Sequence, residues 1–131
     1  MKHAATIYLL LAILPLHGCA RDFQAELGAE GLRLLQVEAD ALWREHVDPA
    51  SGSPRGIVLA RDKWPATVTA VSPEEVHVRR EGTYIFVSSG YLNSQFLFVP
   101  CPKCPASGLV PGSKVPLREI APRVYERSAA R

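Results

Sequence analysis

Residues 76–88, Val-His-Val-Arg-Arg-Glu-Gly-Thr-Tyr-Ile-Phe-Val-Ser, contain the clearest β-structure signal in the chain. Apolar and polar side chains alternate from Val76 to Arg79, as they do in a strand with one buried face. Glu81-Gly82 supplies a tight turn, and Thr83–Ser88 is rich in β-branched and aromatic residues. The segment therefore predicts a β-hairpin, around which the rest of the domain is organised.

Apolar segments on both sides of the hairpin predict further elements. Phe96–Val99 supplies a third strand, and Val124-Tyr125 predicts a short strand at the edge of the sheet. Upstream, apolar residues recur every three or four positions over Trp64–Val71, which favours a short helix. The β-branched run Thr67–Thr69 also suits a strand, but we predict the helix.

Residues 29–46 have the periodicity of one amphipathic helix. Their apolar side chains recur at spacings of three and four and share one face, whereas charged and polar side chains occupy the other. On the polar face, Asp40 and Arg44 are spaced to form an i,i+4 ion pair. The turn-forming run Asp48–Pro54 ends the helix. The apolar face comprises Leu32, Leu35, Ala39, Leu42, Trp43 and His46.

Together these elements predict an α+β fold, in which one N-terminal helix packs on a small antiparallel sheet of three or four strands. Residues 29–131 are expected to form a single small domain, which suits the length of the chain. The 15 Lys and Arg residues are interspersed with 13 Asp and Glu residues. A nucleic-acid partner would require a clustered basic surface, so none is expected.

The first 18 residues have the layout of an export signal. Met1–His3 is basic, and Ala4–Leu14 is an apolar run shorter than the roughly 20 residues that a membrane-spanning helix needs. The residues Leu16-His17-Gly18-Cys19 that follow resemble the lipobox of bacterial lipoproteins, Leu-x-Gly-Cys. The resemblance implies that signal peptidase II cleaves between Gly18 and Cys19 and that the Cys19 sulfur carries a diacylglycerol.

The lipobox implies a cell-envelope protein that the N-terminal lipid holds in the membrane, with residues 19–28 as lipidated cysteine and polar tether. An Asp directly after the lipidated cysteine would resemble an inner-membrane retention signal, but position 20 is Ala. In a Gram-negative host the expected location is therefore the outer membrane, facing the periplasm. His17 departs from the lipobox pattern, where Ala, Ser or Thr is usual. Secretion as a soluble protein is the alternative, because Gly18-Cys19-Ala20 also fits a small-x-small cleavage site.

After the signal, Cys101-Pro102-Lys103-Cys104 is the segment whose side chains are best suited to chemistry, and it has three interpretations. A local structural disulfide suits an exported protein, because such a protein meets an oxidising compartment. Thiol–disulfide exchange is the second, since Cys-x-x-Cys resembles the motif of thioredoxin-like oxidoreductases, although Pro105–Gly112 cannot continue as the helix that such a site needs. The third is a metal site, although tetrahedral zinc wants four ligands.

The further ligands of such a metal site would be His46 and His77, the histidines left after cleavage. Each has a simpler explanation. His46 is expected at the C-terminal end of its helix, where a cation is favoured. His77 lies on the polar side of Val76-His77-Val78 and is expected to face solvent. No cofactor is expected, because the chain has no nucleophile–base motif and no phosphate-binding glycine loop.

The spacing of Trp-Pro, Val-x-Val, Gly-x-Tyr-Ile, Phe-Val and Val-Tyr over Trp64–Tyr125 also resembles small exported bacterial proteins that are uncharacterised, which implies kinship of fold alone. The sequence therefore predicts a lipid-anchored, non-enzymatic envelope protein that acts as an accessory or through contacts with another envelope protein. The alternative is thiol–disulfide or metal handling in the periplasm through Cys101 and Cys104.

Overall fold

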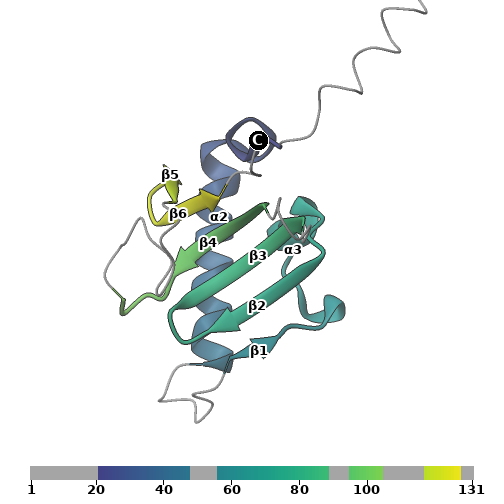
Figure 1. The fold of residues 1–131 in the computed structure, drawn as a ribbon, viewed down its shortest axis with the longest axis vertical. Helices are drawn as coiled ribbons and strands as arrows, with labels where there is room; N and C mark the ends of the chain where they lie inside the picture. The colour runs from purple at the N-terminus through teal and green to yellow at the C-terminus, as the bar shows by residue number, and fades with distance from the viewer. Residues whose placement is uncertain (1–20, 48–55, 89–94, 105–116, 128–131) are drawn as a thin grey trace, which may run out of the picture.

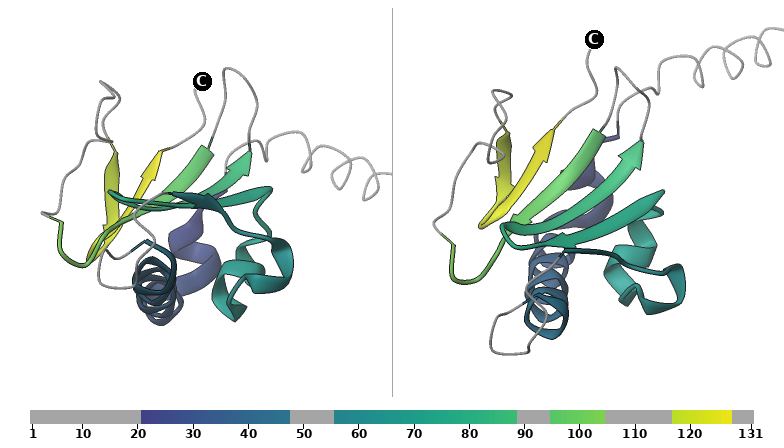
Figure 2. Two further views of the ribbon diagram at one scale, coloured as in Figure 1. Left: turned by 90° about the horizontal axis from the view of Figure 1, so that it is seen from below. Right: turned by 60° about the horizontal axis from the view of Figure 1, so that its bottom comes forward.

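The computed structural model describes residues 21–47, 56–88, 95–104 and 117–127. These residues form an α+β fold, as predicted, with helices on one face of a twisted antiparallel sheet (Figures 1 and 2). The helical elements are α2 (Phe23–His46), the 3₁₀ turn η3 (Arg61–Lys63) and α3 (Ala66–Val71). The strands are β1 (Ile57–Val58), β2 (Glu75–Arg79), β3 (Gly82–Ser88), β4 (Gln95–Pro100), β5 (Arg118–Ala121) and β6 (Val124–Arg127).

The sheet has six strands in the order β1-β2-β3-β4-β6-β5, so the prediction of three or four was too low. The predicted hairpin is confirmed as β2–β3, and the predicted third strand as β4. The two extra strands are β1, with two residues, and β5, with four, and both are too short to give an alternating pattern. Val124-Tyr125 lies in β6, which is not an edge strand because it pairs with both β4 and β5.

The two faces of the sheet carry different side chains because successive residues of a strand point to opposite sides. The face beneath α2 and α3 is aliphatic, and the face on the other side is aromatic. No described helix covers the aromatic face (Figure 2). The aliphatic face contributes Val76, Val78, Ile85, Leu97, Val99 and Val124 to the core. The aromatic face carries Tyr84, Phe86, Phe96, Phe98 and Tyr125.

Helix α2 begins at Phe23, six residues before the predicted start at Ala29. Its first turn is capped by Asp22, whose side chain accepts the Ala25 N–H at 3.2 Å, and Phe23 is fully buried. Gly28, with φ 66°, interrupts the helical geometry and kinks α2. Residues 21–28 are therefore part of the fold rather than a polar tether. Neither α2 nor any other helix in the described residues is long and apolar enough to cross a membrane.

The short helix predicted over Trp64–Val71 is confirmed as α3, despite its β-branched residues. Its own N-cap, Pro65, has no side chain that can accept a hydrogen bond. Instead, the Glu38 carboxylate on α2 accepts the N–H groups of Thr67 at 3.0 Å and Val68 at 3.2 Å. A carboxylate at this position accepts hydrogen bonds from free N–H donors of the first turn, and its negative charge interacts favourably with the positive end of the helix dipole. Tertiary contact thus decides between helix and strand here.

Asp40 is buried, with 8% of its surface exposed, and does not form the predicted pair with Arg44. Its carboxylate accepts two hydrogen bonds from the Arg123 guanidinium, at 2.9 and 3.0 Å, and one from Gln36 at 3.1 Å. Arg123 lies in the β5–β6 turn with φ 60° and also donates to the Pro100 carbonyl at 2.7 Å. One side chain therefore fastens α2, the end of β4 and the C-terminal hairpin together.

Replacing Arg123 with alanine is expected to lower the free energy of unfolding by about 2–3 kcal/mol, because it leaves the Asp40 carboxylate buried without its cation. Urea denaturation of the purified variant measures this loss. The matched control is Arg33→Ala, which removes an exposed ion pair with Glu30 and should cost less than about 1 kcal/mol. Equal losses in the two variants would contradict the clamping role of Arg123.

Candidate functional site

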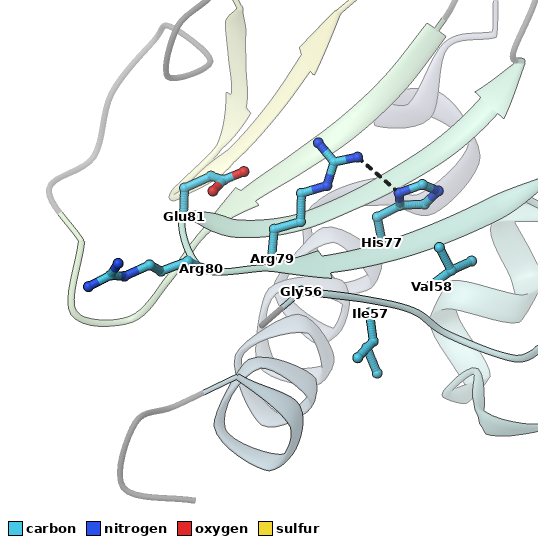
Figure 3. A pocket seen from close by; sticks show the side chains of 7 residues that line it. All are labelled: Gly56, Ile57, Val58, His77, Arg79, Arg80 and Glu81. Atoms are coloured by element: carbon cyan, nitrogen blue, oxygen red, sulfur yellow. Dashed lines mark hydrogen bonds between the residues drawn. The ribbon is translucent and has the colours of Figure 1, made fainter. Parts of the chain in front are cut away.

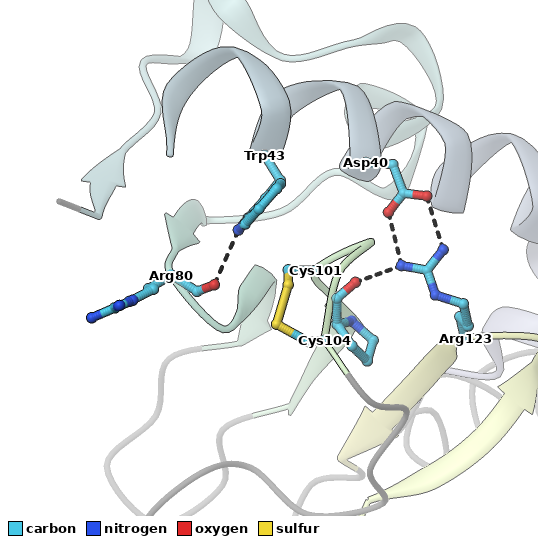
Figure 4. The surroundings of a disulfide bond; sticks show 7 residues. Asp40, Trp43, Arg80, Cys101, Cys104 and Arg123 are labelled. Atoms are coloured by element: carbon cyan, nitrogen blue, oxygen red, sulfur yellow. Dashed lines mark hydrogen bonds and ion pairs between the residues drawn. A yellow bond between two sulfur atoms is a disulfide. The ribbon is translucent and has the colours of Figure 1, made fainter. Parts of the chain in front are cut away.

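A disulfide joins Cys101 and Cys104 directly after β4, with the two Cα atoms 5.1 Å apart (Figure 4). The Cys104 N–H donates to the Cys101 carbonyl at 3.0 Å, which closes a turn. The Cys101 N–H donates to the Glu81 carbonyl at 2.9 Å, so this turn is attached to the turn between β2 and β3. We call residues 101–104 the disulfide turn.

The two sulfur-bearing residues of the disulfide turn differ in exposure. Cys101 has 2% of its surface exposed and belongs to the hydrophobic core, whereas Cys104 is half-buried. Trp43 lies beside them on α2 and donates its indole N–H to the Arg80 carbonyl at 3.1 Å (Figure 4). An exchange-active cysteine needs an accessible sulfur and a group that stabilises its thiolate. A buried first cysteine within the core instead suits a cross-link that holds a turn in place.

The structure does not bring together the four residues of the hypothetical metal site. Cys101 and Cys104 are bonded to each other, and a metal would need them as free thiolates. His46 lies in the last turn of α2, as predicted, with its Nε2 3.8 Å from the Glu45 carboxylate. His77 lies on the aromatic face of the sheet, away from α2. Among the described residues, no group of three or more His, Cys, Asp or Glu side chains could hold a metal ion.

His77 lies on the face of β2 opposite the buried Val76 and Val78, as predicted, but it is packed against its neighbours rather than freely exposed. Only 17% of its side-chain surface is exposed, and its ring meets Phe86 edge-on at 5.0 Å between centroids. Arg79 donates to Nδ1 at 3.2 Å, so Nε2 carries the proton and donates to Glu75 at 2.7 Å. Both ring nitrogens are therefore engaged in hydrogen bonds to neighbouring side chains.

Beside this network lies an open groove of about 460 Å³ at the β1 edge of the sheet (Figure 3). Its charged lining is net cationic, because it contains the guanidinium groups of Arg79 and Arg80 and the single carboxylate of Glu81, which accepts the Tyr84 hydroxyl at 3.1 Å. The groove offers guanidinium groups and a sheet edge, but no serine, threonine or cysteine. It therefore suits binding of a partner better than covalent chemistry. The lining residues are Gly56, Ile57, Val58, His77, Arg79, Arg80 and Glu81.

The groove is not among the sites that the sequence predicts. One signal was present, because residues 75, 77 and 79 alternate along β2 and must share a face. The other wall comes from β1, which gives no periodic signal. The hydrogen-bond network of Glu75, His77 and Arg79 could therefore be predicted from the sequence, whereas the groove could not.

The aromatic face of the sheet forms a second cluster of buried side chains. The rings of Tyr84 and Phe98 are 4.7 Å apart between centroids, and those of Phe86 and Phe96 are 5.4 Å apart. Burial raises the pKa of Tyr84 above its ordinary value, and the neighbouring Glu81 raises it further. Burial also raises the pKa of Tyr125, with an additional contribution from Glu119. Both phenols are therefore held in the neutral form.

These raised pKa values predict a loss of stability in alkali. Below the unfolded-state pKa of about 10 the two phenols are neutral in both states, and the stability is intact. Above it, Tyr84 and Tyr125 ionise in the unfolded chain first, so the free energy of unfolding should fall by up to about 1.4 kcal/mol per pH unit for each tyrosine. Urea midpoints measured from pH 8 to 11 check this, and a Tyr84→Phe/Tyr125→Phe double variant should lose less over the same range. An equal loss in the double variant would contradict it.

No protein-family model matches the chain, and no curated protein or solved structure matches it either.

Proposed function

We propose that this chain is a lipid-anchored protein of the cell envelope and that its domain acts through contacts with another envelope protein rather than through catalysis. The observation that carries the proposal is the position of the fold relative to Leu16-His17-Gly18-Cys19. Arg21, the first residue that the structure describes, is already hydrogen-bonded to Gln95 of β4, and Asp22 caps α2. Cleavage before Cys19 would thus release an intact domain immediately behind the lipid-bearing residue.

The two surface features of the domain support a contact function. The groove beside β1 has a volume of about 460 Å³ and presents cationic side chains next to a sheet edge. Such an edge pairs readily with an added strand of a partner. The disulfide turn is fastened to the β2–β3 turn that forms one end of this groove. Both features suit a rigid docking surface, and the buried Cys101 supports a structural role for the disulfide.

Replacing Cys19 with serine is expected to abolish the anchor, because serine cannot form the thioether to diacylglycerol. Cells that express the variant should accumulate the uncleaved precursor and incorporate no labelled fatty acid into it. The matched control is a Cys101→Ser/Cys104→Ser double variant, which removes the other two cysteines and should keep the label. Mass spectrometry of the wild-type N-terminus provides the direct measurement. An unlipidated protein that begins at Arg21 would contradict the proposal and support secretion.

A further inference from the structure

We propose that the end of the domain that carries Arg21 lies directly against the lipid headgroups, with no tether between the fold and the anchor. This inference rests on the proposed function, because it takes Cys19 as the site of lipid attachment. We call the surface concerned the anchor end. It comprises the half-buried Arg21 and the exposed residues Asp22, Gln24, Ala25 and Ser72.

The backbone of Arg21 is fixed to the fold on both sides. Its N–H donates to Oε1 of Gln95 at 3.5 Å, and its carbonyl accepts from Nε2 of the same side chain at 3.1 Å. Gln95 opens β4 and has only 3% of its surface exposed. A buried amide that pairs with both polar groups of one residue holds that residue in register with the sheet. The ordered chain therefore reaches back at least to Arg21.

The side chain of Arg21 adds contacts to two helices. Its guanidinium donates to the Val71 carbonyl at the end of α3 and pairs with Glu26 on α2 at 2.6 Å. The same group lies 5.1 Å from the centroid of the buried Phe23 ring. Arg21 thus joins α2, α3 and β4, and releasing it would break contacts with all three.

The chain between this fixed residue and the anchor is very short. Consecutive Cα atoms are about 3.8 Å apart, so the Cα of Cys19 lies within about 7.6 Å of the Cα of Arg21. The headgroup region on each side of a bilayer is about 5–8 Å thick. The glycerol that links the acyl chains to Cys19 lies in this region. The anchor end must therefore reach the headgroup layer whenever the lipid is inserted.

The charges of the anchor end indicate that the covalent lipid, rather than attraction to anionic lipids, imposes the contact. The positive charge of Arg21 is paired with Glu26, and Asp22 adds a negative charge engaged in capping α2. Of the five described residues that define the anchor end, only Arg21 is basic, whereas anionic membranes attract clusters of basic side chains. The contact should therefore persist at high salt.

This placement orients the rest of the domain. Figure 1 shows the start of α2, the end of β3 and the start of β4 at one end of the molecule, and the end of α2 and the β2–β3 turn at the opposite end. Arg80 and Glu81 of that turn line the groove. The disulfide turn is attached to the same turn by the hydrogen bond from the Cys101 N–H to the Glu81 carbonyl. Both features would thus face away from the bilayer, where a partner can reach them.

The contact is testable with two single-cysteine labels on the full, lipidated protein. Ala25→Cys places a fluorophore on the anchor end, and Glu45→Cys places the same fluorophore on an exposed site at the other end of α2. Each protein is reconstituted in phosphatidylethanolamine/phosphatidylglycerol vesicles that contain a lipid with a nitroxide on its headgroup. We expect at least threefold stronger quenching at position 25 than at position 45, both at low salt and in 0.5 M NaCl.

A linker variant tests whether the short chain causes the contact. Insertion of ten Gly and Ser residues between Ala20 and Arg21 should reduce quenching at position 25 to the level at position 45, while the protein still floats with the vesicles. Equal quenching at the two positions in a protein that floats would overturn the contact and leave the anchor standing. A protein that carries no lipid and does not float would overturn both the contact and the proposed function.

Discussion

Replacing Phe23 with alanine is expected to lower the free energy of unfolding by about 3–5 kcal/mol, the usual cost of emptying a fully buried phenylalanine site. Phe23 has no exposed surface and packs in the main core between α2 and the sheet. The sequence places it as a single aromatic residue within a polar stretch, which is why residues 21–28 read as a tether. Urea or thermal denaturation of the purified variant measures the loss.

The control for Phe23 is Val37→Ala on the same helix, because 49% of Val37 is exposed. This variant should cost less than about 0.5 kcal/mol, as surface substitutions usually do. A Phe23 variant as stable as the Val37 variant would show that the segment before Gly28 does not belong to the folded unit. It would also remove the structural basis for a domain that starts beside the anchor.

Replacing Gly82 with alanine is expected to destabilise the protein by at least about 3 kcal/mol, from backbone strain and overpacking together. Gly82 has φ 153°, a conformation that other residues rarely adopt. An added Cβ would lie 2.3 Å from the Val99 carbonyl oxygen and 2.9 Å from the Pro100 Cα. Both neighbours are backbone atoms of β4, which cannot move aside without breaking the β3–β4 pairing.

Gly28→Ala separates the two causes of this effect. Gly28 also has a positive φ, of 66°, but no atom lies within 4 Å of an added Cβ. That variant should show the backbone strain alone, about 1–3 kcal/mol, because φ 66° with ψ 177° is a region that essentially only glycine adopts. Chemical denaturation of both variants gives the comparison. Equal losses at the two positions would mean that close approach of β4 is not the reason for a glycine at position 82.

The parts of the fold that the sequence predicted correctly are those with a long periodic pattern. The β2–β3 hairpin and most of α2 repeat their pattern over many residues, and β4 is a continuous apolar run. The parts it missed depend on contacts between distant segments. Asp40 has the sequence neighbourhood of a surface residue, and only the β5–β6 turn, 83 residues away, explains its burial. The start of α2 likewise depends on Gln95 and Val71.

The candidate sites also differ in whether they are formed by neighbouring residues or by distant segments of the chain. The disulfide turn is a local feature, and its two cysteines are three residues apart, so their pairing was among the predicted interpretations. The groove needs β1 beside β2, with Val58 opposite His77, and a two-residue strand gives no pattern from which that pairing could be predicted. The hypothetical metal site failed because His46 and His77 belong to elements on different sides of the sheet.

The position of β6 in the sheet has a consequence for the order in which the domain can assemble. A chain is synthesised from its N-terminus, and the strand that completes the pairing of β4 is formed by residues 124–127. Until those residues emerge, β4 presents a row of unpaired backbone groups along one side, the kind of edge that recruits other chains. A nascent chain therefore exposes this edge of β4 from the synthesis of residues 95–100 until residues 124–127 can pair with it.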